Sequence, residues 1–213
     1  VLFFRGWIGN DGAHLTRRSW YSVKNMVGGG TLLDNGVHLI DLIRYMVDEI
    51  TSCSSCVTSN LRWKFDSVED TGIAVYNLSN GGMAVVYSSW VDKSGYMYFE
   101  VHGLDGFIHV DSRWGKALVT YGRSFQDKTT EDYTDYPKLS YDLELESFVN
   151  DYRRGFHPKP TGYDGYRAVK IVLSSYKCVN GNVHQVFDEE DRKLERLYTK
   201  TFKVEEPYIR WQS

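Results

Sequence analysis

The sequence lacks the cysteines, long apolar runs and excess positive charge that mark disulfide-rich, membrane and nucleic-acid-binding proteins. Its 213 residues include three cysteines, and so small and odd a number argues against a disulfide framework and favours a reducing compartment such as the cytoplasm. No apolar run approaches the roughly 18 residues of a membrane helix, and no signal peptide opens the chain. The net charge of −3 supplies no basic stripe for nucleic acid. These absences predict an ordinary globular protein that binds neither membranes nor nucleic acid.

Two of the cysteines, Cys53 and Cys56, have the spacing of a redox or metal pair. They lie in a Ser-, Thr- and Val-rich segment that reads as a strand. Its alternation places Cys53 on the same face as Val57 and Cys56 on the opposite face. Two thiols on opposite faces cannot share a metal or a disulfide without a turn, and the sequence has no second cysteine pair to complete a zinc site. We therefore expect both thiols to be structural.

Strands dominate the first two thirds of the sequence. The opening VLFFRGWIG reads as a strand interior, so we expect the chain to continue a larger protein. Further strands are predicted over residues 50–65, 71–78, 83–91, 95–102, 107–111 and 116–122, joined by turn signals such as Asn80-Gly81-Gly82. Such a succession predicts an α+β fold with a large, mainly antiparallel open sheet and helices packed on one face.

Helices are predicted around this sheet. One follows the glycines at 28–30, one spans residues 140–155 with apolar residues at helical spacing, and one runs over residues 164–179, where Asp164 is a natural N-cap. Residues 126–138 read as a polar loop. We expect one domain over residues 1–188 and a charged tail, an arm or an edge strand, over residues 189–213.

The helix that follows the glycines carries polar residues in an otherwise apolar sequence. At 100° per residue, Asp34, His38, Asp41 and Tyr45 fall on one stripe about 60° wide. We expect the helix to be largely buried, with this stripe lining a cleft or facing a polar partner. A carboxylate at i can reach an imidazole at i+4, where it fixes one tautomer and favours the imidazolium. The pair Asp34 and His38 is therefore a candidate general acid/base.

Two other interpretations of the stripe stay open. Its members can be satisfied polar residues of the core, with Asp34 bridging to another element. A metal site is the second alternative, but only two or three ligands are visible and no H-E-x-x-H motif occurs, so no metal is predicted.

The same segment, GGGTLLDNGVHLIDLIRYMV, resembles the G-G-G-x-L-x-D-x-G-x-H-x-x-D segment of the Gfo/Idh/MocA oxidoreductases. The resemblance includes three glycines (28–30), Asp34, Gly36, His38 and Asp41. The RRSW before the glycines, SGYMYFEVHGLDGFI and the late GYDGYRAVKIVLSSYKC also agree in order and spacing, so the resemblance covers roughly residues 1–188.

This resemblance implies the C-terminal, substrate-side domain of an NAD(P)-dependent oxidoreductase. The enzyme would act on the CH–OH group of a sugar or polyol and would form a homo-oligomer through the open sheet face. NAD or NADP would be bound mainly by a Rossmann domain outside this chain, and a partner lysine in an E-K-P motif would lie there as well. Since this sequence has neither E-K-P nor G-x-G-x-x-G after a strand, we expect it to be inactive alone.

By the same resemblance, Asp34 and His38 match the family's catalytic pair, and His38 carries the proton of the substrate hydroxyl. Candidate substrate contacts are Arg17, Trp20, Tyr96 and Tyr163, although packing explains each of them equally well. The three glycines let the backbone pass close to the cofactor or to another element. The alternatives to an enzyme are a non-catalytic ligand-binding relative and a structural oligomerisation module of the same fold.

Overall fold

The structure, a computed structural model, describes residues 1–13, 15, 19–65, 67–138, 140–178, 184–186, 191, 193 and 194. The chain divides into two compact units. The first comprises Val1–Asp135 and Arg167–Val186, and the second comprises Tyr136–Tyr166 and Phe187–Ser213. The predicted boundary at residue 188, the predicted tail over 189–213 and the predicted substrate contact Arg17 lie almost wholly outside the described residues, and they stay predictions.

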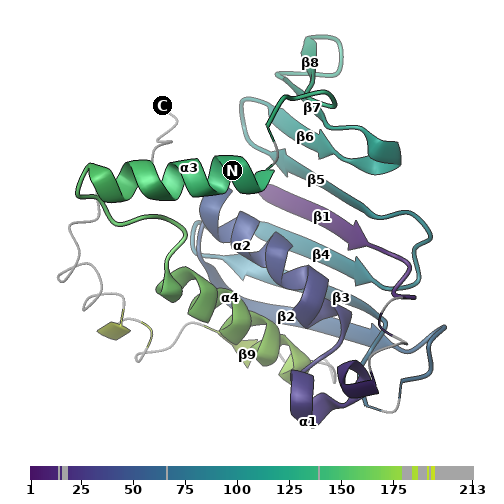
Figure 1. The fold of residues 1–213 in the computed structure, drawn as a ribbon. Coiled ribbons are helices and arrows are strands. Elements are labelled where there is room, and N and C mark those ends of the chain that lie inside the picture. The colour runs from purple at the N-terminus through teal and green to yellow at the C-terminus, as the bar shows by residue number, and fades with distance from the viewer. Residues whose placement is uncertain are drawn as a thin grey trace. The chain divides into compact units, whose positions relative to one another are not determined.

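The first unit is built on a nine-stranded sheet with the order β8-β7-β6-β5-β1-β4-β3-β2-β9 (Figure 1). The strands are β1 (Phe3–Gly9), β2 (Ile50–Ser59), β3 (Thr71–Leu78), β4 (Met83–Ser89), β5 (Tyr96–His102), β6 (Phe107–Asp111), β7 (Leu118–Gly122), β8 (Lys128–Asp132) and β9 (His184–Gln185). Every neighbouring pair is antiparallel except β1 with β4. The predicted large, mainly antiparallel open sheet is confirmed.

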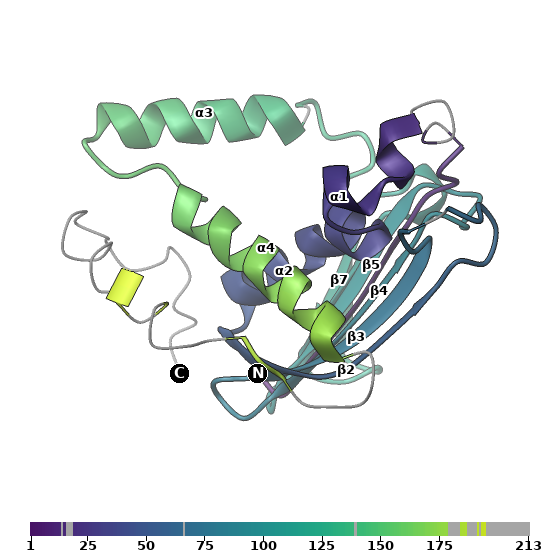
Figure 2. The same cartoon turned by 90° about the horizontal axis from the view of Figure 1, so that it is seen from below.

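Helices of this unit cover one face of the sheet (Figure 2). They are α1 (Lys24–Val27), a π-helical segment (Leu32–Gly36), α2 (Val37–Met46) and the later part of α4 (Gly162–Ser175), with 3-10 turns at Ser19–Ser22, Arg113–Gly115 and Tyr176–Cys178. Buried apolar residues of α2, α4 and the sheet form a single core cluster: Phe4, Leu39, Ile40, Ile43, Ala74, Val86, Phe99, Ala168, Ile171 and Val172. The prediction of helices on one face is confirmed for this unit.

Two glycines in the strands let these helices lie close to the sheet. A Cβ on Gly6 would come within 2.9 Å of the Leu39 side chain, and a Cβ on Gly72 within 2.4 Å of the Leu32 side chain. Glycine inside a strand is otherwise unfavourable, so its presence here is explained by this close approach.

A buried ion pair ties α4 to the end of the sheet. Arg167 is 0% exposed and donates to Glu49 Oε1 at 2.9 Å and to the Val186 carbonyl at 2.9 Å. Removing one member of such a pair leaves an uncompensated buried charge, so the contact fixes where α4 docks.

The prediction that Cys53 and Cys56 face opposite sides of their strand is wrong. Both side chains are buried in the same core cluster, together with Cys178, because β2 is irregular against β3 between Ile50 and Ser52 and again between Cys53 and Ser55. All three cysteines are free thiols. Burial raises the pKa of Cys53 and of Cys56 to about 12, so both thiols stay protonated, as structural cysteines do.

Three local predictions need correction. Strand β2 ends at Ser59 rather than at residue 65, and the polar loop predicted over residues 126–138 contains β8. Asp164 is not the N-cap of α4. It accepts hydrogen bonds from the Thr161 backbone N–H at 2.8 Å and from the Thr161 hydroxyl at 2.7 Å, so Thr161 is the N-cap and Asp164 is its partner three residues later.

The second unit contains α3 (Ser140–Arg153) and the first turn of α4. The helix predicted over 140–155 is thereby confirmed. None of the α3 residues is buried. No helix in the described part of the chain is both long and apolar enough to cross a membrane.

Candidate active site

The glycine run that precedes α2 is packed against other protein elements. Glu69 accepts hydrogen bonds from the backbone N–H groups of Gly30 at 2.9 Å and Leu32 at 3.0 Å, and from the Tyr176 hydroxyl at 2.7 Å. Burial and the Glu69 carboxylate both raise the pKa of Tyr176, so its phenol stays protonated and donates. A Cβ on Gly30 would lie 1.9 Å from the Glu69 carbonyl oxygen, and one on Gly29 would lie 2.3 Å from the Tyr176 hydroxyl. The glycines therefore serve the approach of another element, one of the two alternatives that the sequence left open.

The helix begins with a π-helical segment, which the sequence did not predict. Residues Leu32–Gly36 are π-helical and α2 follows at Val37. A π turn is wider than an α turn, so a projection at 100° per residue does not hold across this segment. Asp34 lies inside this segment and His38 lies in α2, beyond it.

Asp34 has two aromatic hydrogen-bond donors. The Tyr21 hydroxyl donates to Asp34 Oδ1 at 3.3 Å, and the Trp90 indole N–H donates to Oδ2 at 3.2 Å. The expected hydrogen bond with His38 is absent among the described residues. The predicted pairing of Asp34 with His38 therefore stays a prediction, and in this conformation the carboxylate is held by Tyr21 and Trp90.

Trp90 is itself held firmly. It is 1% exposed, and its carbonyl accepts a hydrogen bond from the Trp63 indole N–H at 2.7 Å. Its backbone N–H donates to the Asp70 carbonyl at 2.8 Å. Phe65 packs edge-on against its ring at 5.9 Å between centroids. The indole that donates to Asp34 is thus fixed by the loop between β2 and β3.

An aromatic hollow of about 240 Å³ opens beside this carboxylate. It is lined by Trp20, Tyr21, Met26, Val27, Gly29, Leu33, Asp34 and Trp90. Trp20 and Tyr21 lie 4.5 Å apart between ring centroids, and Trp20 is 46% exposed. The hollow thus places flat aromatic surfaces beside one anchored carboxylate.

The rest of the polar stripe faces outward. His38 is exposed and Tyr45 is 64% exposed, while Asp41 forms an ion pair with Arg44 at 3.8 Å. Only the opposite side of α2, with Leu39, Ile40 and Ile43, is buried. The expectation of a largely buried helix is therefore wrong, because these three are the only buried residues among the ten of α2.

The other predicted substrate contacts are not all brought together. Trp20 lines the hollow with Asp34. Tyr96 lies on the opposite face of the sheet, in a separate hollow of about 370 Å³ with Trp7, Tyr98 and Arg113, where it donates to Asp92 at 3.2 Å. Tyr163 belongs to the second unit, and Arg17 lies outside the described residues.

Sequence reasoning missed Tyr21, Trp90 and Glu69 as parts of this site. Tyr21 adjoins Trp20, which was singled out, so the neighbouring aromatic residue was a usable signal. Trp90 lies at the end of the predicted strand over 83–91, where strand ends present side chains to a site. Glu69 carried no signal, because its contact with the glycines spans 39 residues.

Asp34 and the exposed His38 lie about one helical turn apart along the chain. The glycines that precede them are packed closely against Glu69 and Tyr176. The sequence has no G-x-G-x-x-G fingerprint.

Comparison with known proteins gives consistent results. The chain is 27% identical over 149 residues to inositol 2-dehydrogenase 3 of Saccharopolyspora erythraea, covering 69% of this chain and 44% of that protein. It is 28% identical over 164 residues to myo-inositol 2-dehydrogenase of Thermotoga maritima, covering 72% of this chain and 48% of that protein. The chain therefore spans about half the length of the curated relatives it matches.

Solved structures share the fold. Levoglucosan dehydrogenase in complex with NADH and levoglucosan has a TM-score of 0.71 at 21% identity, covering 87% of this chain and 58% of that one. Aldose-aldose oxidoreductase from Caulobacter crescentus, complexed with glycerol, has a TM-score of 0.73 at 19% identity, covering 87% and 55%. At these identities the likeness establishes the fold alone.

The family model described as the GFO/IDH/MocA C-terminal domain matches residues 1–109, which include the glycine run, Asp34, His38 and the first five strands of the sheet. The chain belongs to the GFO/IDH/MocA family and represents its C-terminal domain.

Proposed function

We propose that this chain is the substrate-side domain of an NAD(P)-dependent oxidoreductase that acts on the CH–OH group of a sugar or polyol. The observation that carries the proposal is the anchored Asp34 carboxylate at an aromatic hollow, one helical turn before the exposed His38. Relatives named as inositol dehydrogenases and a structural neighbour bound to NADH and levoglucosan support the substrate class and the cofactor.

The whole protein would divide the work between two domains. Because this chain spans about half the length of its curated relatives, a Rossmann domain outside it would hold NAD or NADP and supply the partner lysine. The nicotinamide would take the hydride from the carbinol carbon. The open polar side of α2 would then face that domain and the substrate between them.

His38 would accept the proton that the substrate hydroxyl loses. Its imidazole is exposed in this chain, so solvent or substrate reaches it without rearrangement of the core. An imidazole is a competent general base, and such transfer contributes about 10²–10⁴-fold to the rate.

Asp34 would orient the reacting groups. Tyr21 and Trp90 fix its two oxygens at 3.3 and 3.2 Å, yet each carboxylate oxygen retains a further lone pair for a substrate hydroxyl or for the His38 N–H. Since the two side chains start about one turn apart on the helix, a rotamer change of His38 is the movement that would join them. Trp20 would add an apolar surface for the C–H face of the sugar.

Steady-state kinetics of the whole protein test this function. We expect NAD(P)-dependent oxidation of inositol or a related polyol, with kcat about 100-fold lower in His38→Ala. The variant Asp34→Asn keeps the shape of the site and should lower kcat as well. Residues 1–213 alone should be inactive. Unchanged turnover in His38→Ala, or oxidation by the isolated chain, would count against the assignment.

A second function, homo-oligomerisation through the uncovered face of the sheet, is favoured by one specific feature. Paired residues place Val57, Ile73, Tyr87, Trp7 and Tyr98 in one row across five strands. Val57 is 61% exposed and Ile73 is 42% exposed, and so continuous an apolar row is characteristic of an interface.

Light scattering of the purified chain tests this second function. An oligomer that dissociates in Val57→Lys supports it, with Leu104→Lys, in an exposed hairpin turn, as the matched control. A monomer at high concentration would refute it. If His38→Ala leaves turnover unchanged while the oligomer persists, the chain is a non-catalytic binding or oligomerisation module instead.

A further inference from the structure

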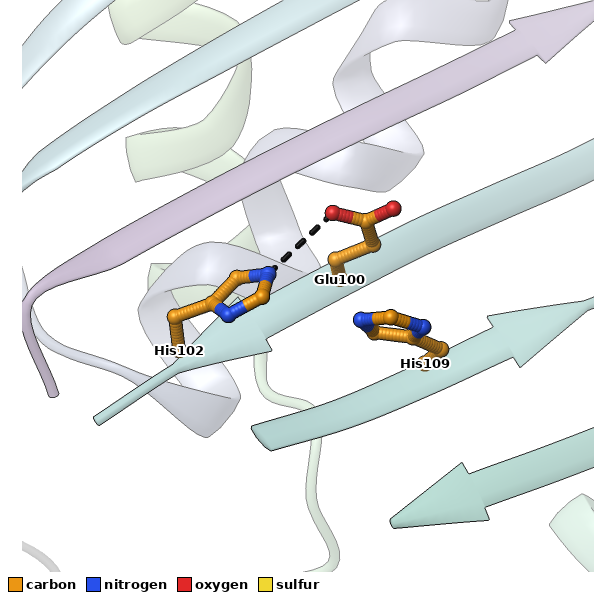
Figure 3. A group of neighbouring side chains, drawn as sticks. All are labelled: Glu100, His102 and His109. Carbon is orange, nitrogen blue, oxygen red and sulfur yellow. Dashed lines mark hydrogen bonds and ion pairs between the residues drawn. The ribbon is translucent and has the colours of Figure 1, made fainter. Parts of the chain in front are cut away.

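Three potential metal ligands meet on the uncovered face of the sheet. Glu100 and His102 come from β5 and His109 comes from β6, and Figure 3 shows the three side chains gathered on adjacent strands. The register explains the meeting, because Glu100 pairs directly with His109 and His102 lies two residues further along the same strand face. One ligand atom from each residue lies within 4.8 Å of the others.

The donors already point toward one another. His102 Nε2 lies 3.2 Å from Glu100 Oε2, and the rings of His102 and His109 are 5.4 Å apart between centroids. Nε2 of His109 is buried and has no hydrogen-bond partner among the described residues. A buried ring nitrogen without a partner is costly, and the described part of the chain offers no compensating contact for it. The cluster therefore contains an unfilled polar position.

We propose that Glu100, His102 and His109 bind a divalent transition-metal ion such as Zn²⁺ on the uncovered face of the sheet. Two imidazoles and one carboxylate are a ligand set that suits zinc, with water in the fourth position, whereas Ca²⁺ and Mg²⁺ prefer oxygen ligands. The ion would link β5 to β6. This site uses the sheet face opposite α2, so it is independent of the function proposed for Asp34 and His38.

Arg5 is the group that competes with the ion. Its Nε donates to Glu100 Oε2, and its side chain is 46% exposed whereas that of Glu100 is 5% exposed. The guanidinium can therefore swing into solvent while the carboxylate stays in place. Its positive charge would repel a bound cation, so removing it should tighten metal binding.

Calorimetric titration of the metal-free chain with ZnCl₂ tests the site, and visible absorption of added Co²⁺ reports the ligand geometry. We expect one Zn²⁺ per chain, with binding at least about tenfold weaker in His102→Gln and in His109→Gln, since even the supporting residues of metal sites contribute that much. His157→Gln, which removes an exposed histidine of the second unit, should bind normally. Circular dichroism confirms that each variant is folded.

Arg5→Gln should bind Zn²⁺ more tightly than the unaltered chain. Misfolding would not produce such a gain in affinity. Equal affinities in the unaltered chain, His102→Gln and His109→Gln would overturn the proposal, as would the absence of saturable binding. Binding that is no tighter in Arg5→Gln would contradict Glu100 as a ligand. If His109→Gln does not fold, the 40% exposed side chain of His102 makes His102→Gln decisive by itself.

Discussion

Replacing Asp70 by asparagine should destabilise the first unit and loosen the candidate active site. Asp70 is 0% exposed. Its carboxylate accepts the backbone N–H groups of Leu61 at 2.9 Å, Arg62 at 2.7 Å and Trp63 at 3.0 Å. The same loop positions the Trp63 indole on the carbonyl of Trp90, and Trp90 in turn holds Asp34. One carboxylate thus connects the loop after β2 to the hollow.

The magnitude follows from the donors that asparagine cannot serve. Its amide has a single oxygen, and its NH₂ group would face backbone N–H groups that need an acceptor. At least one charge-assisted hydrogen bond is lost, at about 1.5–3 kcal/mol each, and a buried donor is left unsatisfied. We expect Asp70→Asn to lower the free energy of unfolding by about 3 kcal/mol at pH 7.

The pH dependence gives an independent check of the same reasoning. Burial alone would raise the pKa of Asp70, but the three backbone donors outweigh it and the pKa is lowered. A depressed folded-state pKa contributes stability above the unfolded value of about 3.9 and loses it as pH falls through the folded value. The difference between the unaltered chain and Asp70→Asn should therefore shrink below about pH 4.

Urea unfolding followed by tryptophan fluorescence measures this effect. Asp105→Asn is the matched control, since Asp105 is exposed in the turn between β5 and β6 and its replacement should leave the midpoint unchanged. A loss in Asp70→Asn below about 0.5 kcal/mol, the size of an ordinary surface substitution, would refute the role given to this carboxylate.

Three further predictions concern packing, thiols and acid stability. Gly30→Ala should lower the free energy of unfolding in urea by about 3 kcal/mol or more, because the new Cβ would lie 1.9 Å from a carbonyl oxygen. In the control Gly95→Ala the new Cβ meets nothing within 4 Å, so this variant should keep its stability. Equal losses of stability in the two variants would contradict the close approach at Gly30. Cys53 and Cys56, with pKa values of about 12, should resist thiol reagents at pH 8 until the chain unfolds, and labelling of the folded chain would count against their burial. The pKa of Glu100, lowered to about 2, predicts that Glu100→Gln is less stable at neutral pH and that the gap closes as pH falls from about 4 toward 2, as acid titration of both proteins would reveal.

Regular pattern in the sequence predicted the regular parts of the fold. Turn signals separated the strand-like runs that form β3, β4, β5 and β6, and the signal at Asn80 preceded β4 as expected. In β3 and β4 buried residues alternate with more exposed ones, because one side of each strand packs against the core. The resemblance at the glycine run likewise pointed to the family that the comparison confirmed.

The sequence-based predictions of side-chain direction failed where the backbone departs from the regular periodicity of a strand or a helix. Irregular pairing in β2 turns Cys53 and Cys56 to one face, and the π turn around Asp34 breaks the 100° projection. The Asp34 carboxylate is bound by Trp90, which lies 56 residues later in the sequence. The roles of Asp34 and His38 therefore stay predictions, and the sequence did not indicate how their side chains are held, since that is decided by packing.

The most direct test of the central claim is kcat for polyol oxidation by the whole protein with and without His38. The account predicts that His38→Ala lowers kcat about 100-fold, while His157→Ala leaves it unchanged. An unaltered kcat in His38→Ala would contradict the claim that this chain carries the proton-transfer residue.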